Sequence, residues 1–167
     1  MTGQRESLPI SVSHVLRRAG VRHPLQRWVE VDELSVGDAV IEADTPIEVE
    51  LIFEATGNSV VASGELRTVA RCCCRRCLET FLAPIVAPVR EIFEVKPVDG
   101  ETYPLHAEHV DLVPLVRDAL LLALPLAPLC RLDCPGPAPE LFPTGLEDTP
   151  VVLDPRWAAL DQLKLDG

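Results

Sequence analysis

The stretch that decides the fold is IEVELIFEATGNSVVASGELRTVARC, residues 47–72. Over residues 47–55 apolar side chains alternate with glutamates, and this period of two is typical of a strand with one buried face. Residues 56–58, TGN, signal a turn. We expect the return strand over about 59–72, with a bulge or bend at Gly64. The stretch therefore predicts an antiparallel hairpin.

Residues 79–95, ETFLAPIVAPVREIFEV, predict the next strand of the sheet. Apolar side chains again recur at every second position, and Pro84 and Pro88 both fall on the opposite face. Because proline cannot donate a hydrogen bond, two prolines indicate an edge strand or a break into two pieces. The following segment, 96–109, has the composition of a loop, with a turn at Asp99-Gly100.

Residues 111–125, DLVPLVRDALLLALP, give the clearest helical pattern. Asp111 is the expected N-cap, and Pro114 falls in the first turn, where its missing N–H does no harm. Pro125 ends the helix. The helix is apolar on nearly every side, so we expect it to be buried. The sequence thus predicts an α+β fold, in which an antiparallel β-sheet or partly open barrel is packed by one buried helix.

The rest of the chain divides by composition. We expect one helical turn in SHVLRRAG, capped by Ser11 or Ser13, and a short strand in RWVEVDEL. Asp154 is the expected cap of a last helix, DPRWAALDQLKL. The predicted organisation is a basic irregular arm, an α+β core, a Pro-rich segment and a C-terminal short helix, at residues 1–26, 27–134, 135–153 and 154–167.

Composition excludes several classes of protein. The chain has 167 residues, of which 47% are hydrophobic, as in a globular domain. Aromatic residues make up only 4%, which argues against a base-stacking platform. The longest apolar run, 119–130, is broken by prolines and is too short to cross a bilayer, and no signal peptide is visible. We therefore expect a soluble cytoplasmic protein with no membrane partner.

The charge is unevenly distributed along an acidic chain. The formal net charge of −11 opposes non-specific binding to phosphate over the whole surface. Two short stretches, 1–27 and 67–76, nevertheless concentrate arginines. They are either solvated faces or contact surfaces for RNA or another partner. The candidate contact residues are Arg17, Arg18, Arg67, Arg71, Arg75 and Arg76.

Six cysteines raise the question of a metal. In a reducing compartment they indicate metal ligands or buried thiols before disulfides. The pairs Cys74-x2-Cys77 and Cys130-x3-Cys134 can complete a tetrahedral S₄ zinc site, and the alternatives are bare thiols or a redox pair. The redox interpretation is weak because no helix follows Cys77. We interpret the remaining two, Cys72 and Cys73, as packing residues of the strand.

Motifs of catalysis are not evident in the sequence. It has no Gly-rich phosphate loop, no His-Glu-x2-His and no Gly-x-Ser-x-Gly. The four histidines are scattered and are interpreted as surface residues. We therefore expect no enzymatic activity.

Two segments, ARCCCRRCLETF (70–81) and VDLVPLVRDALLLALPLAPLCRLDCPG (110–136), resemble the YceD family of large ribosomal RNA subunit accumulation proteins. SHVLRRAG and DPRWAALDQL resemble terminal segments of its actinobacterial branch. The resemblance implies a role in making or stabilising 23S rRNA during large-subunit assembly, without enzymatic activity. It also implies a gene that commonly lies beside that of ribosomal protein L32.

The resemblance also bears on the metal ligands. Cys74 and Cys77 match the family's Cys-x-x-Cys, and Cys134 matches a following cysteine. Cys130 stands where many relatives have a histidine, an exchange that a zinc ligand tolerates. Relatives often continue with further cysteines, whereas residues 135–142, PGPAPELF, have none.

Three functions remain open from the sequence. The first is a biogenesis factor that contacts 23S pre-rRNA or a large-subunit precursor through Arg71, Arg75 and Arg76. The second is an acidic interaction module that holds a basic ribosomal protein such as L32. The third is a zinc-stabilised structural domain without contact to nucleic acid.

Overall fold

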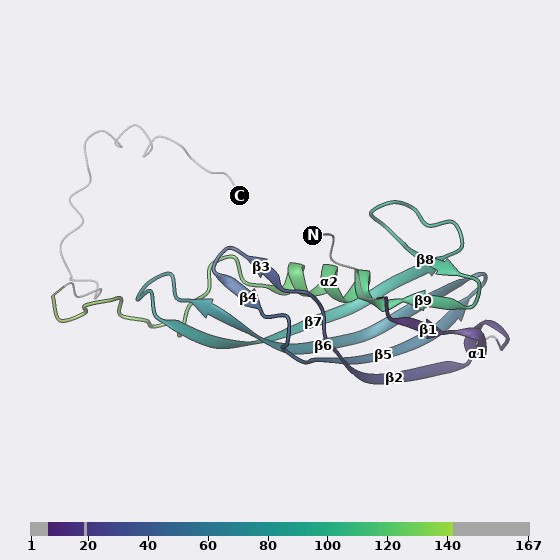
Figure 1. Cartoon of the computed structure of the whole chain (residues 1–167), viewed down its shortest axis with the longest axis horizontal. Coiled ribbons are helices and arrows are strands. Elements are labelled where there is room, and N and C mark those ends of the chain that lie inside the picture. Colours follow the sequence, from purple (N-terminus) through teal and green to yellow (C-terminus); the bar gives the residue numbers. More distant parts are fainter. Residues whose placement is uncertain (1–6, 19, 142–167) are drawn as a thin grey trace, which may run out of the picture.

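In the computed structural model, which describes residues 7–18 and 20–141, the strands form one curled sheet with helix α2 against its inner face (Figure 1). The elements in chain order are β1 Pro9–Ser11, α1 Ser13–Leu16, β2 Arg22–Val29, β3 Leu34–Val36, β4 Ala39–Ile41, β5 Ile47–Thr56, β6 Ser59–Cys73, β7 Thr80–Glu94, β8 Tyr103–His106, β9 His109–Asp111 and α2 Leu112–Ala123. The α+β class predicted from the sequence is confirmed.

The centre of the sheet is the antiparallel meander β5–β6–β7. Strand β6 is long enough to pair with β5 along its first half and with β4 near its end, while β7 follows its other edge. On the inner face, side chains of β5, β6, β7 and α2 form the core, including Phe53, Leu66, Phe93 and Leu120. The predicted hairpin is therefore confirmed, with β5 and β6 at nearly the expected bounds.

Of the bulge or bend predicted at Gly64, the bulge is wrong. Gly64 pairs with Leu51 on one side and Val89 on the other, and the ladder continues through it without an extra residue. Its backbone has φ +154°, and a Cβ atom at this position would lie 2.0 Å from the Glu50 carbonyl oxygen. Glycine is required here because β5 approaches the backbone too closely for any side chain.

Strand β7 carries both of its prolines in a stretch with a partner strand on one side only. Pro84 and Pro88 face Val69 and Glu65 of β6, while β8 joins β7 only at Phe93 and Glu94. The edge-strand prediction is thus confirmed for this stretch. The alternative, a break into two pieces, is wrong, because β7 continues without interruption over Thr80–Glu94.

Helix α2 begins as the sequence predicts. Asp111 Oδ1 accepts a hydrogen bond from Val113 N at 3.1 Å, which satisfies one of the free donors of the first turn. The same carboxylate accepts from Leu8 N at 2.9 Å, so the cap also fixes the N-terminal segment. Burial is less complete than expected, because Leu122 is 88% exposed. The helix therefore buries one side against the sheet and presents another to solvent.

The expectation of an irregular N-terminal arm is wrong for residues 9–26. Strand β1 pairs with β9, and β2 begins at Arg22 rather than at Arg27. Helix α1 confirms the predicted turn, but its N-cap is Val12 without a side-chain bond, so the serine caps are wrong. The expected loop 96–109 likewise contains β8 and the start of β9. Strand β1 depends on a partner that is remote in sequence, while β8 and β9 pair with each other across a short turn and are too short to show a periodic pattern.

The predicted C-terminal helix and most of the Pro-rich segment lie outside the described residues, and the division into four regions stays a prediction. Within the described part of the chain, no helix combines the length and apolarity that a membrane crossing requires.

Candidate functional site

Four cysteine sulfurs meet at one end of the molecule. The Sγ atoms of Cys74, Cys77, Cys130 and Cys134 all lie within 4.8 Å of one another. Cys74 Sγ lies 3.8 Å from Cys134 Sγ, and Cys77 Sγ lies 3.8 Å from Cys130 Sγ. These separations exceed the disulfide bond length, so each pair consists of free thiols. The two sequence pairs are thus brought together as predicted.

The turn between β6 and β7 holds the first pair. Leu78 N donates to the Cys74 carbonyl and Cys74 N donates to the Glu79 carbonyl, each at 2.9 Å, which closes a tight loop around the two thiols. Cys73 N donates to the Asp38 carbonyl at 3.0 Å, so the end of β6 is also fixed to the segment before β4. The loop therefore has little freedom to move its sulfurs.

The segment after α2 brings the second pair to this turn. Arg75 N donates to the Pro128 carbonyl at 3.0 Å. The Arg76 guanidinium donates to the carbonyls of Leu132 at 3.3 Å and Cys134 at 3.1 Å. Arg76 thus joins the two cysteine segments, and its side chain is committed to this structural contact.

The sulfur spacing fits a tetrahedral metal site. With Zn–S bonds of about 2.3 Å, the sulfurs of a tetrahedron are separated by about 3.8 Å. The two closest pairs are found at this separation, 3.8 Å, and all four ligands are of the soft thiolate type that zinc accepts. The cluster is therefore compatible with zinc.

Local hydrogen bonds change the acidity of these thiols. Backbone N–H groups of Cys130, Cys77 and Arg76 stabilise the thiolate of Cys74 and lower its pKa to about 6. Desolvation and the neighbouring thiols raise the pKa of Cys130 to about 12. A hydrogen bond from Glu79 N–H lowers the pKa of Cys77, but desolvation and the thiols of Cys74 and Cys134 outweigh it. The pKa of Cys77 is therefore also raised. Of these three thiols, Cys74 therefore forms its thiolate most readily.

The other two cysteines of the run lie outside the cluster, as predicted. Cys72 is buried in the core, and burial raises its pKa. Cys73 lies at the end of β6, and its Sγ donates to the Leu78 carbonyl at 3.3 Å.

The predicted contact arginines are mostly engaged within the molecule. Arg71 pairs with Glu42 at 2.7 Å, and Arg17 pairs with Glu108 at 3.0 Å. Arg67 lies among Glu48, Glu50 and Glu65, and its hydrogen bond to Glu50 raises its pKa. By contrast, the side chains of Arg18 and Arg75 have no partner among the described residues.

The structure keeps the candidate contact residues Arg17 and Arg18 far from Arg75. Helix α1, which precedes Arg17 and Arg18, lies at one end of the long axis, and the β6–β7 turn with Arg75 lies at the other (Figure 1). The role of these arginines as contact residues stays a prediction.

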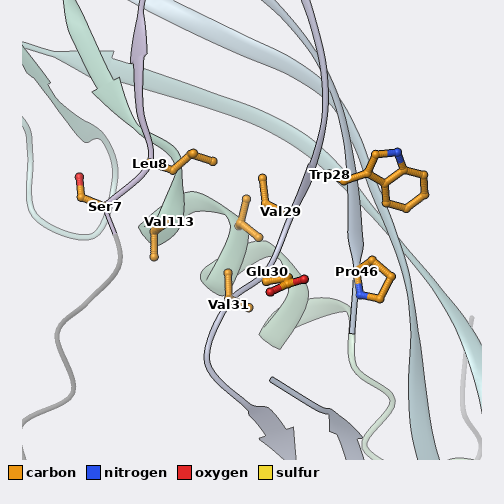
Figure 2. A pocket seen from close by; sticks show the side chains of 9 residues that line it. Ser7, Leu8, Trp28, Val29, Glu30, Val31, Pro46 and Val113 are labelled. Atoms are coloured by element: carbon orange, nitrogen blue, oxygen red, sulfur yellow. The ribbon is translucent and has the colours of Figure 1, made fainter. Parts of the chain in front are cut away.

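Two grooves were not predicted from the sequence. One, of about 650 Å³, lies beside α2 and is lined by acidic residues and two leucines: Glu91, Asp99, Glu101, Asp118, Leu121 and Leu122, with Tyr103. Tyr103 Oη donates to Asp118 Oδ2 at 2.9 Å, and burial followed by Asp118 raises the Tyr103 pKa. The second, of about 530 Å³, lies beside Trp28 (Figure 2). The lining residues come from distant segments, so no local motif indicates either groove.

Together the fold and the cluster define a β-sheet protein whose central hairpin and post-helix segment are joined by four thiols. A family model named large ribosomal RNA subunit accumulation protein YceD matches residues 62–164. The chain belongs to the YceD family, whose name refers to accumulation of large-subunit ribosomal RNA and to no reaction.

Similar curated proteins come from mycobacteria. Uncharacterized proteins of Mycobacterium tuberculosis and Mycobacterium bovis are each 26% identical over 168 residues, covering 93% of this chain and 81% of the relative. An uncharacterized protein of Mycobacterium leprae is 29% identical over 159 residues, covering 88% of this chain and 73% of the relative. No solved structure gives a significant match.

Proposed function

We propose that this chain supports accumulation of 23S rRNA as a non-enzymatic cytoplasmic factor that holds a basic ribosomal protein during large-subunit assembly. Ribosomal protein L32 is the first candidate for that partner. The observation that carries this proposal is the state of the arginines: four of the six candidate contact residues bind carboxylates or carbonyls of the chain itself, as shown for Arg17, Arg67, Arg71 and Arg76. These arginines are thus less available to phosphate, and the chain's formal net charge of −11 makes its surface charge predominantly negative.

The acidic groove beside α2 supports this proposal. Glu91, Asp99 and Glu101 line it together with exposed Leu122. A lysine- or arginine-rich segment can place its cations on the carboxylates and its aliphatic stems on the leucine.

The four-thiol cluster has a structural role in this proposal. A bound zinc would hold the β6–β7 turn against residues 130–134 and so fix the end of the sheet. Cys74, Cys77, Cys130 and Cys134 would be its ligands.

The test is a binding assay with separated large-subunit components. The immobilised chain is offered isolated basic ribosomal proteins, L32 among them, and protein-free 23S rRNA, at low and at physiological salt. We expect retention of the basic protein, with weaker binding as salt increases. Glu101→Lys should weaken binding, whereas Glu140→Lys makes the same charge change outside the groove and serves as the control. The proposal is contradicted if the chain retains rRNA but no basic protein, and if the Glu101→Lys and Glu140→Lys variants show the same retention.

Direct contact with pre-rRNA is the second candidate, and the free side chain of Arg75 favours it. This arginine is exposed on a turn that the hydrogen bond from its own backbone N–H to Pro128 makes rigid. If it contacts a phosphate, Arg75→Glu should weaken binding to 23S rRNA and lower the salt slope by about 1. Arg90→Glu is the matched control, and an unchanged slope in Arg75→Glu would exclude the contact.

A further inference from the structure

We infer that the groove beside Trp28 is a docking site for a short segment of a partner protein that carries a lysine or arginine next to an aliphatic side chain. This inference rests on the proposed function, because it names a place at which a basic partner would be held. It is carried by the shape of the groove, the exposure of Trp28 and the charges around it.

The groove has an apolar side that faces α2. It lies where the segment after β2 passes over the helix, and it has a volume of about 530 Å³. Figure 2 shows Leu8, Val29, Val31 and Val113 gathered on this side. Val31 and Val116 are buried and form the apolar base of the groove. Such a slot can take one aliphatic side chain of a partner.

The opposite side of the same segment carries an exposed aromatic ring. Trp28 is 67% exposed, although it lies in a strand, and the ring of Pro46 lies near it in Figure 2. An exposed indole offers a large apolar surface that a partner can cover, and tryptophan is among the residues that dominate binding energy at interfaces. Its face also attracts a lysine or arginine cation.

The charges around the ring select the partner. Glu30 lines the groove on the side of Trp28, and its carboxylate has no partner among the described residues. Glu48 is the cross-strand neighbour of Trp28 and shares its face of the sheet. Glu48 is partly compensated by Arg67 at 3.7 Å, and Arg117 lies 3.9 Å from Asp32, but no basic residue lines the groove itself.

These features fit one occupant better than others. An acidic segment would be repelled by Glu30, and a purely apolar one would leave the Glu30 carboxylate without a partner on binding. A basic residue beside an aliphatic one pairs with that carboxylate, covers the indole and fills the slot.

The test uses the full chain with Trp157→Phe, so that Trp28 is the sole tryptophan. The probe is a labelled peptide of alternating leucine and arginine; in the control peptides glutamate replaces arginine or serine replaces leucine. We expect the leucine–arginine peptide alone to bind and to shift Trp28 emission to the blue. Trp28→Ala and Glu30→Gln should each weaken binding about tenfold, as loss of one buried anchor does. Leu82→Ala and Glu140→Gln change exposed positions outside both grooves and should leave affinity unchanged.

Each other outcome has a defined meaning. Equal binding of the glutamate peptide, or an unchanged affinity in Trp28→Ala, overturns the inference. If removal of residues 1–6 alone shifts Trp28 emission to the red, the chain's own N-terminus occupies the groove, and the inference also fails. If a basic ribosomal protein binds Trp28→Ala as tightly as the unaltered chain, the inference falls and the proposed function stands. Failure of the unaltered chain to bind any basic ribosomal protein defeats the proposed function, while the peptide assay still decides the role of the groove.

Discussion

Leu78 is the residue at which the thiol cluster strains the backbone. Its φ of 62° lies in the left-handed region, which suits glycine and costs other residues about 1–3 kcal/mol. The turn requires this conformation because Leu78 N donates back to the Cys74 carbonyl. The side chain is 69% exposed, so burial of leucine does not offset the strain.

Leu78→Gly should therefore stabilise the protein. We expect the free energy of unfolding to rise by about 1 kcal/mol, because relief of strain outweighs the added freedom of glycine in the unfolded chain. Urea denaturation measures the change. Leu82→Gly, at an equally exposed position in the extended strand β7, is the control and should destabilise. Destabilisation of both variants to the same extent would contradict the role of φ at Leu78.

Zinc affinity should increase with pH because a proton must leave Cys130. Its pKa is raised to about 12, so at neutral pH its thiol is protonated in the metal-free protein and competes with the metal. Below that pKa, each unit of pH should strengthen binding about tenfold for each proton displaced. Competition with a chelator between about pH 6.5 and 8.5 measures this dependence. An affinity that does not vary with pH would show that the cluster is already ionised.

The clustering of the four cysteines was predictable at this scale, whereas the strained leucine was not. Cys74 and Cys77 are close in sequence, and Cys130 and Cys134 follow a helix whose end is marked by Pro125. The spacing alone indicated a shared site. A left-handed leucine has no sequence signal, because its conformation is imposed by the hydrogen bonds of the turn.

At the scale of elements, Gly64 controls how closely β5 and β6 approach. Gly64→Ala should lower the free energy of unfolding by more than about 3 kcal/mol, since its Cβ would meet backbone atoms that cannot move aside. Gly57→Ala is a matched control: Gly57 also has positive φ, 63°, but open space around it, so we expect a loss of about 1 kcal/mol. Thermal and urea unfolding compare the two. Similar losses in both would refute the close-approach argument.

The prolines of β7 protect its open edge from pairing with another chain. A strand edge with free donors is a template for association, and proline removes the donor. Replacing Pro84 and Pro88 together by threonine should leave the sheet folded but increase self-association, detected by light scattering and size-exclusion chromatography. Replacement of Pro24, in the edge strand β2, is a comparison at another edge. A double variant that remains monomeric at high concentration would contradict this role.

Elements with strong local signals were predicted well, and elements that depend on remote partners were not. The β5–β6 hairpin has alternating residues and a turn signal, and α2 has its cap at Asp111. Strands β1 and β9 are three residues each; β1 pairs with β9, and β9 pairs with β8 as well. Residues this few carry no period that a sequence pattern can detect.

Across the whole molecule, the thiol cluster connects segments that are 60 residues apart in sequence. A metal cross-link over such a loop contributes on the order of 4 kcal/mol, by analogy with a disulfide of equal span. Chelation should therefore lower the melting temperature and speed tryptic cleavage at Arg131. Cys74→Ser should lose both effects of the metal, whereas Cys72→Ser, outside the cluster, should still respond to the chelator. Identical melting with and without chelator, in protein shown to contain zinc, would contradict a stabilising role.

The pairing of β1 with β9 and the contact of Cys74 with Cys134 also determine the order in which native contacts can form during synthesis. At about 5–20 residues per second, the N-terminal strand waits roughly 5–20 s before its partner has been made. During that interval the meander can close, but β1 has an unsatisfied edge and the first two thiols have no second pair. The thiol cluster can be completed only after Cys134 leaves the exit tunnel, so a chain truncated before that residue would leave it incomplete.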